Sequence, residues 1–180
     1  MSQCSAFGIE GLIRVGYCRA AGEGLLAQAN RRFQLVLIKP SRYDDDGYIV
    51  QWLRSSIPSN SLAVLYGIAA EAAAAKVLGD DVEIDVTVLD EFNSRVDAAP
   101  LIALLRRHDN FGLIGLVGVQ SNQFPRALDI ARPLRAVGLP VVIGGFHVSG
   151  CLAMLPELPE DIKEAQDLGI GLFAGEAEGR

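Results

Sequence analysis

Small polar residues and glycines directly follow two of the apolar runs in this sequence. Ser121 and Asn122 follow one run, and the pair Gly144-Gly145 follows the next. A serine hydroxyl can donate to a ligand nitrogen or accept from it, and paired glycines permit unusual backbone dihedral angles and clear side chains from a binding face. Ligand binding is therefore one interpretation. In the other, Ser121 caps a helix that begins at Pro125, and the glycines form an ordinary turn.

The two histidines could supply acid–base or metal-binding chemistry. His147 lies two residues beyond the glycine pair, and an imidazole there could ligate a metal or titrate near neutrality. A lone histidine can equally be a hydrogen-bonding loop residue, and His108 suits the end of a helix. Neither has a carboxylate, serine or cysteine partner that the sequence identifies as a triad, so we predict no catalytic residue and no metal ligand.

The segment 40–61 is about twenty residues without a helix or strand pattern, and loops of that length are usually functional or mobile. Asp44-Asp45-Asp46 could bind a divalent cation, but adjacent acids without further spaced ligands are more typical of a solvated turn. Tyr43, Tyr48 and Trp52 could stack on a flat cofactor or simply pack the loop.

Motifs that would indicate nucleotide or phosphate chemistry are missing. There is no GxxxxGK[ST] segment and no GxGxxG after the first apolar run, which disfavours a nucleotide-phosphate enzyme. A response-regulator receiver needs acids after the first strand and an aspartate after the third. Lys39-Pro40 and Gln120-Ser121 occupy those places. The chain therefore lacks the acidic residues of a receiver and is not expected to be one.

Five apolar runs predict β-strands: 33–38, 82–89, 113–119, 141–143 and 170–174. The first, third and fourth are continuously apolar, as in strands buried on both faces. The second interleaves acids and suits a position near a sheet edge. Four helical segments alternate with these runs, so we predict a doubly wound, Rossmann/flavodoxin-like α/β domain. Its sheet is parallel and five-stranded in the order 2-1-3-4-5, with helices on both faces.

The predicted helices have identifiable ends. The first carries apolar residues at helical spacing over 62–77 and stops at Gly79, and the second begins near Pro100 with Asp97 as its cap. The third starts at Pro125 and ends at Gly138, with Pro133 expected to bend or shorten it. The fourth runs over 159–168, with Glu160 and Asp161 in its first turn, where acids favour the helix dipole.

Composition restricts the class of protein further. Of 180 residues, half are hydrophobic and 21% are charged, and the net charge is −6; these values exclude wholesale disorder and argue against a nucleic-acid partner. No apolar run reaches the roughly 18 residues of a membrane span. Cys4, Cys18 and Cys151 are too widely spaced for a disulfide framework or a CxxC metal site, so we expect a reducing, cytoplasmic location.

The chain divides unevenly into two parts. Residues 1–32 have no clear period and no signal-peptide apolar stretch, and we expect a loosely packed arm. Residues 33–180 form the α/β domain. In such a domain ligands bind beyond the carboxyl ends of the strands, where strand order reverses. That rule selects the loops 40–61, 120–124 and 144–150.

Those loops and their flanks resemble a known family. The stretch GLIGLVGVQSNQFPRALDIARPLRAVGLPVVIGGFHVSG, the later GEAEGR and the earlier PSNSLAVLYGIAAEA resemble the cobalamin-binding domain at the amino end of cobalamin-dependent radical S-adenosylmethionine (SAM) proteins. The resemblance covers about residues 33–180. Its sharpest parts are Gly-Gly-x-His after the fourth strand and Gly-Glu-x-Glu after the fifth.

This resemblance implies a Rossmann-like domain that holds cobalamin with its nucleotide tail in the carboxyl edge of the sheet. Ser121 would face the dimethylbenzimidazole end of the tail, Gly144 and Gly145 would line its channel, Phe146-His147 would border it, and Glu176 and Glu178 would lie near the junction with the next domain. The implied cofactor contacts are Ser41, Tyr43, Ser121, Asn122, Gly144, Gly145, Phe146, His147, Gly175 and Glu176.

Two departures from related patterns matter. Better-known cobalamin folds carry Asp-x-His-x-x-Gly after the first strand, but 40–61 contains no histidine, so no histidine of that loop is a lower cobalt ligand. Cobalt would then be five-coordinate, or ligated by water or by another side chain, including one from the long loop. The three cysteines also cannot form the CxxxCxxC cluster site of radical chemistry. We therefore expect a non-catalytic domain that binds cobalamin and presents it to a radical SAM catalytic domain in cis or in trans, for methyl transfer. The alternatives are a flavodoxin-like module for flavin or nucleotide, and a non-catalytic interaction domain.

Overall fold

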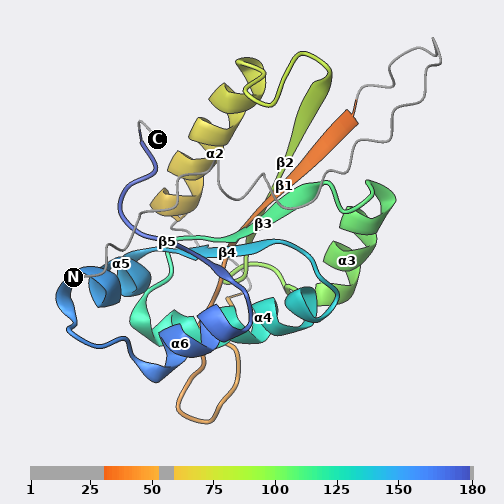
Figure 1. The fold of residues 1–180 in the computed structure, drawn as a ribbon. Coiled ribbons are helices and arrows are strands. Elements are labelled where there is room, and N and C mark those ends of the chain that lie inside the picture. The colour runs from red at the N-terminus through yellow and green to blue at the C-terminus, as the bar shows by residue number, and fades with distance from the viewer. Residues whose placement is uncertain (1–30, 53–58, 179–180) are drawn as a thin grey trace.

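The computed structural model describes residues 31–52 and 59–178 and confirms the predicted α/β architecture. Strands and helices alternate along the chain (Figure 1). In order they are β1 (Arg31–Lys39), α2 (Asn60–Ala74), β2 (Val82–Asp90), α3 (Ala98–Arg107), β3 (Gly112–Leu116), the short 3-10 helix η1 (Ser121–Gln123), α4 (Phe124–Ala136), β4 (Val141–Gly144), α5 (Phe146–Met154), α6 (Glu160–Asp167) and β5 (Gly171–Phe173).

The sheet is parallel throughout, in the predicted order β2-β1-β3-β4-β5. Strand β1 pairs with β2 along its whole length, from Arg31 opposite Val82 to Lys39 opposite Asp90, and its second half pairs with β3. Strand order therefore reverses between β1 and β3, and this is the point where a doubly wound sheet binds ligands.

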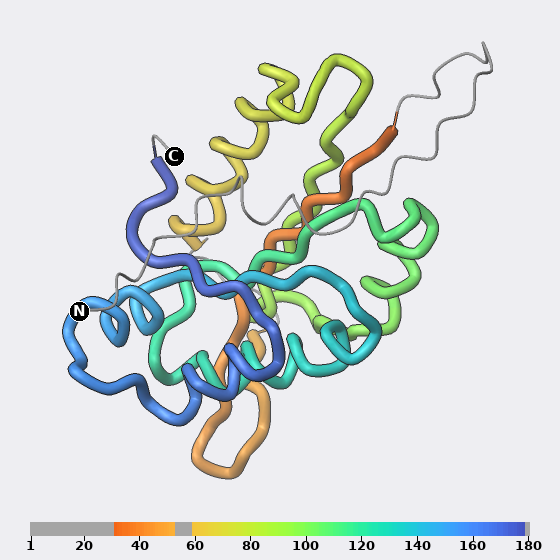
Figure 2. The backbone as a smooth tube through the Cα atoms, viewed as in Figure 1, coloured from red at the N-terminus to blue at the C-terminus, as the bar shows by residue number. Residues whose placement is uncertain are grey.

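The helices cover the two faces of the sheet unequally. Helices α3, α4, α5 and α6 all contribute to the larger hydrophobic core. Among the described helices, only α2 contributes to the smaller one, through Leu62 and Ala69 against Leu37 and Val117. Figure 1 shows α2 on one side of the sheet, opposite α3, α4 and α6. In the tube view the described chain after β5 turns toward the α2 side (Figure 2).

One loop prediction was wrong: much of 144–150 is helical. Helix α5 begins at Phe146, directly after Gly145. Val148 and Cys151 recur at helical spacing and bury one face of α5 in the larger core. Tertiary packing thus stabilises a helix whose local sequence carries few strong helix formers.

Several element boundaries also differ from prediction. Strand β1 begins at Arg31, two residues before the predicted start, and β3 ends at Leu116, although Val117 still donates its backbone N–H to the Ile38 carbonyl. Helix α2 ends at Ala74, well before Gly79, because the chain turns through Lys76 with a positive φ of 51°.

The end signals predicted for α3 and α4 are only partly confirmed. Pro125 lies in the first turn of α4, which continues through Pro133 to Ala136, so Pro133 does not end it. Gly138 follows with a φ of 79°. Asp97 occupies the N-cap position of α3, but its side chain makes no capping hydrogen bond. No helix in the described ranges is both long and apolar enough to cross a membrane.

Candidate functional site

Two of the predicted site residues come into direct contact at the carboxyl edge of the sheet. Ser121 starts η1 after β3, and His147 lies in the first turn of α5 after β4. The Ser121 Oγ atom lies 3.1 Å from His147 Nδ1. The backbone N–H of His147 donates to the Val119 carbonyl, and the N–H of Val119 donates to the Gly144 carbonyl. These bonds join the two strand ends and position both side chains.

A third residue, Asp161 of α6, completes a chain of hydrogen bonds. Its Oδ2 lies 2.9 Å from His147 Nε2, so the imidazole bridges Ser121 and Asp161 through its two nitrogens. The His147 side chain is 12% exposed, and its ring packs 4.5 Å from that of Phe124. Ser121 is exposed. Sequence analysis assigned Asp161 only a helix-dipole role, because contact between α5 and the first turn of α6 is a property of the tertiary fold.

The thiol of Cys151 lies beside the same histidine, with Sγ 3.8 Å from each ring nitrogen of His147. Burial raises the pKa of Cys151, and the nearby carboxylate of Asp161 raises it further. A neutral thiol is a poor metal ligand. Within residues 31–52 and 59–178, no group of three or more His, Cys, Asp or Glu side chains could hold a metal ion.

The glycine pair has a packing role in addition to its predicted one. Gly145 has a φ of +139°, and a Cβ placed on it would lie 2.2 Å from the backbone nitrogen of Val119. Only glycine allows this close approach of two main-chain segments and the sharp turn from β4 into α5. A Cβ on Gly144 would lie 3.2 Å from that of Phe173. That the pair also contacts a ligand stays a prediction.

Part of the sheet on the α2 side has no helix of its own among the described residues. Ile114, Leu116, Val141 and Ile143 face the larger core, so their neighbours along each strand point to the α2 side. We call those neighbours the open strip: Leu113 and Gly115 of β3, Val142 and Gly144 of β4, and Phe173 of β5.

The open strip is continuous across three strands. Gly115 pairs with Val142, and Gly144 pairs with Phe173. Leu113, Val142, Gly144 and Phe173 are only half-buried, whereas α2 makes its sheet contacts on β1 and β2. The result is an apolar, glycine-containing surface that reaches the carboxyl edge at Gly144, within three residues of His147.

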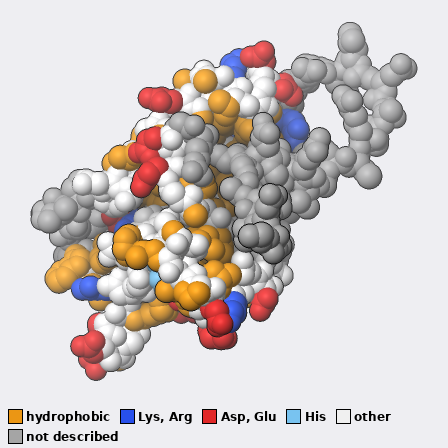
Figure 3. Space-filling view, turned by 60° about the vertical axis from the view of Figure 1, so that its left-hand side comes forward, with side chains coloured by type: hydrophobic (Ala, Val, Ile, Leu, Met, Phe, Trp, Pro, Cys, Tyr) orange, Lys and Arg blue, Asp and Glu red, His pale blue; other side chains and the backbone are white. Residues whose placement is uncertain are grey.

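Apolar side chains are also exposed on and after α5. Phe146 is 75% exposed and Met154 80%, with Leu152 and Leu155 also exposed. Figure 3 brings this side of the molecule forward and shows hydrophobic side chains gathered at its surface. Among the predicted contacts, Phe146 is therefore free to meet a ligand or another chain.

The segment after β1 is tied to the protein by a buried ion pair. Glu91 is fully buried, and its carboxylate accepts three hydrogen bonds of 2.6–3.1 Å from Arg126 and one of 3.0 Å from the Ser41 backbone N–H. Although burial lowers the pKa of Arg126, its bonds to Glu91 and Tyr43 outweigh that effect and raise it. The pair fixes the start of the segment through the bond from Glu91 to the Ser41 backbone.

The predicted contacts Ser41 and Tyr43 use their polar groups internally. Ser41 is fully buried, and its hydroxyl donates to the Val50 carbonyl at 2.5 Å. The Tyr43 hydroxyl lies 2.5 Å from Asp129 Oδ2. The two hydroxyls are thus hydrogen-bonded to Val50 and Asp129, and the role of Ser41 and Tyr43 as cofactor contacts stays a prediction.

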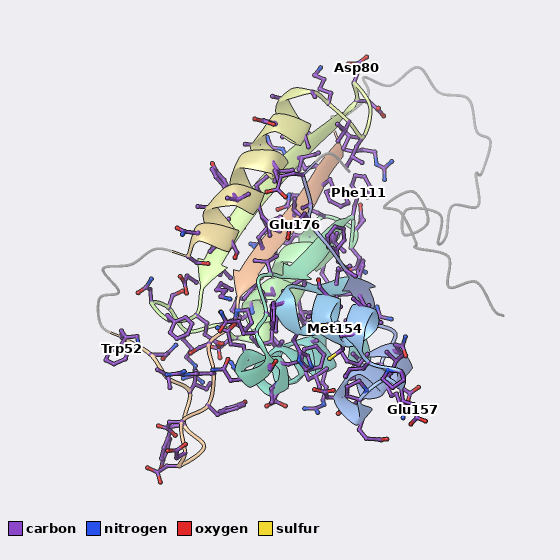
Figure 4. All side chains as sticks on the ribbon, turned by 90° about the vertical axis from the view of Figure 1, so that its left-hand side faces the viewer. Trp52, Asp80, Phe111, Met154, Glu157 and Glu176 are labelled. Atoms are coloured by element: carbon purple, nitrogen blue, oxygen red, sulfur yellow. The ribbon has the colours of Figure 1, made fainter. Side chains whose placement is uncertain are left out.

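Other residues of this segment point to solvent. Asp44 accepts hydrogen bonds from the backbone N–H groups of Asp46 and Tyr48, so the aspartates form the solvated turn that their spacing favoured. Tyr48 is 73% exposed and Trp52 61%. In Figure 4, Trp52 lies well away from both Met154 and Glu176. Residues 53–58 of the predicted loop lie outside the described residues.

A buried lysine at the strand-order reversal was not among the predicted site residues. Lys39, the last residue of β1, is 9% exposed, and its Nζ donates to the Gly118 carbonyl and, at 2.9 Å, to Gln123 Oε1. Burial lowers the pKa of Lys39, and the charge of Asp90 partly offsets that effect. The sequence marked Lys39 only as the end of a strand, because nothing local signals its burial.

The remaining predicted contacts lie around the same edge. Asn122 is exposed next to Ser121. The backbone N–H of Gly175 donates to Ser149 Oγ at 3.1 Å, which holds the chain after β5 against α5. Glu176 is exposed beyond it. Of the ten predicted contacts, the structure directly joins Ser121 to His147, and Asn122, Gly144, Gly145 and Phe146 neighbour these two in sequence. Gly175 is bonded to Ser149, Glu176 is exposed, and Ser41 and Tyr43 belong to a separate hydrogen-bond network.

Comparison with known proteins identifies no relative. No protein-family model, no curated protein and no solved structure matches the chain.

Proposed function

We propose that this chain is a cobalamin-binding domain whose cofactor lies at the carboxyl edge of the sheet, with the nucleotide tail along the open strip. The observation that carries the proposal is the open strip itself: apolar, half-buried surface on β3, β4 and β5 that leads to the edge where Ser121 and His147 meet. The resemblance of residues 112–150 to cobalamin-binding domains points to the same edge.

The residues present fit such a ligand in polarity. Ligand sites are mostly apolar with a few placed polar groups, and a flat benzimidazole packs well on apolar side chains. Leu113, Val142 and Phe173 supply apolar surface, while Gly115 and Gly144 carry no side chain that would occupy the strip. The wider corrin ring would meet exposed groups at the edge, including Ser121 and Phe146.

Bound cobalamin would supply a cobalt centre that can carry a methyl group. The residues of this chain would bind and orient the cofactor, and the radical step would belong to a radical SAM catalytic domain in cis or in trans. No histidine lies in the segment 40–61, so that segment offers no imidazole to the lower face of cobalt.

Titration of the purified chain with hydroxocobalamin, followed by visible absorption and retention on gel filtration, tests the proposal. Val142→Gln places an amide in the open strip, and Val137→Gln is the matched control at the end of α4. Because an amide in an apolar site costs about 1–3 kcal/mol, we expect Val142→Gln to weaken binding about tenfold or more. The control should leave binding unchanged.

A second variant tests the strip without the risk that a buried amide unfolds the protein. Phe173→Ala shortens the apolar surface of the strip without adding a polar group, and circular dichroism checks that each variant keeps its helices. Equal binding by the wild type and both strip variants would place the cofactor elsewhere. A yellow protein that retains flavin and ignores cobalamin would favour the flavodoxin-like alternative.

A further inference from the structure

The hydrogen bonds of His147 fix which of its nitrogens carries the proton. A carboxylate only accepts hydrogen bonds, so Asp161 Oδ2, 2.9 Å away, requires a proton on His147 Nε2. In a neutral imidazole the other nitrogen, Nδ1, is then a bare acceptor. The Ser121 hydroxyl, 3.1 Å from Nδ1, must therefore donate its proton to the ring.

This arrangement determines what Ser121 can offer a ligand. Its only proton is directed at His147, so the exposed oxygen presents lone pairs to the edge of the sheet. The hydroxyl can accept from an N–H group but cannot donate to a ring nitrogen. The expectation that Ser121 meets a benzimidazole nitrogen, itself an acceptor, does not suit this geometry.

We infer that Ser121, His147 and Asp161 form a subsite that accepts a hydrogen bond from a primary amide, such as those at the rim of a corrin ring. Asp161 is a positioning residue, because it acts on the ligand only through His147 and Ser121. The inference rests on the proposed function and deepens it by assigning Ser121 to the corrin amides and not to the nucleotide base.

The protonation pattern can be measured without any ligand. Side-chain nitrogen NMR of His147 near pH 8 should show a protonated Nε2 and an unprotonated Nδ1. Asp161→Asn should disturb this pattern, whereas Asp167→Asn, a matched change at the exposed end of the same helix, should not. A proton on Nδ1 in the wild type would overturn the inference.

Ligand binding supplies the second readout. Cyanocobalamin at pH 8 is the probe. We expect Ser121→Ala to bind it about fivefold more weakly than the wild type, because the variant loses one hydrogen bond from a corrin amide.

The outcomes separate the two proposals. If the wild type binds and Ser121→Ala keeps the same affinity, the subsite is overturned while cobalamin binding stands. If the wild type binds no cobalamin at all, the proposed function fails, and the assignment of a corrin subsite fails with it.

Discussion

The guanidinium of Arg126, in α4, forms a bidentate salt bridge with the fully buried carboxylate of Glu91, which directly follows β2. Glu91 also accepts the backbone N–H of Ser41. One ion pair thus joins the end of β2, the helix after β3 and the segment after β1, all at the carboxyl edge of the sheet. We expect it to be central to the rigidity of that edge.

Removing one partner of this pair should be costly. Arg126→Met leaves Glu91 buried without its counter-charge, and breaking such a pair destabilises a protein by about 3–5 kcal/mol. Urea unfolding measures the loss. The matched control is Arg95→Met, which removes the exposed partner of Asp97 and should change the free energy of unfolding by less than about 0.5 kcal/mol. Equal losses would show that burial of the pair is unimportant.

The backbone of Gly145 should not tolerate a side chain. Gly145→Ala sets a Cβ against the main chain of Gly118 and Val119 at a positive φ, and we expect it to lower the free energy of unfolding by about 2–4 kcal/mol. Gly150→Ala, within α5 and facing open space, should raise it by about 0.5–1 kcal/mol. Opposite signs in the same denaturation assay support the geometry, and a neutral Gly145→Ala contradicts it.

Lys39 should contribute to stability in a pH-dependent way. Its pKa in the folded protein lies below the ordinary 10.5 because of burial. Between the lowered pKa and 10.5 the unfolded chain binds more protons, so the contribution of Lys39 to the free energy of unfolding rises with pH through that window. The variant Lys39→Met lacks this titration. The difference in the free energy of unfolding between wild type and Lys39→Met should therefore increase as the pH rises from the lowered pKa toward 10.5.

Comparing wild type with Lys39→Met also cancels the effect of groups that lower stability as pH rises. The pKa values of Tyr43 and Cys151 are raised in the folded state, chiefly by burial, and they remove stability in alkali from both proteins equally. A difference that stays flat, or that falls as pH rises, would show that Lys39 is not held in a desolvating site.

Cys151 should resist alkylation in the folded protein. It is 7% exposed, and burial together with Asp161 raises its pKa, so little thiolate is available. Iodoacetamide at pH 8, followed by peptide mass spectrometry, should modify Cys151 at least about tenfold more slowly in buffer than in urea. The urea sample is the control for intrinsic reactivity. Similar rates in both would mean that α5 does not cover the thiol.

Much of the fold followed from local pattern. Continuous apolar runs predicted the central strands. The alternation with helices predicted a parallel sheet, because parallel strands need crossover helices, and the order 2-1-3-4-5 is the flavodoxin-like order for such a sheet. Helix α5 was missed because Phe146-His147-Val148-Ser149-Gly150 has no helical signal of its own. It forms because Gly145 turns the chain and Val148 enters the core.

The site was predictable only in part. The rule that ligands bind at the carboxyl ends of the strands predicted that Ser121 and His147 lie at one edge of the sheet. It could not predict that they are hydrogen-bonded to each other. Asp161 lies 14 residues beyond His147, on a helix whose contact with α5 no spacing indicates. Burial of Lys39 and Glu91 depends on residues more than thirty positions away in sequence, so local composition could not reveal it.

Equilibrium dialysis of the purified wild-type chain against hydroxocobalamin tests the central claim most directly. We predict saturable binding of one cobalamin per chain, with a visible-spectrum change that saturates at the same ratio. No retained cobalamin at tens of micromolar protein and ligand, with the chain folded by circular dichroism, would contradict the account.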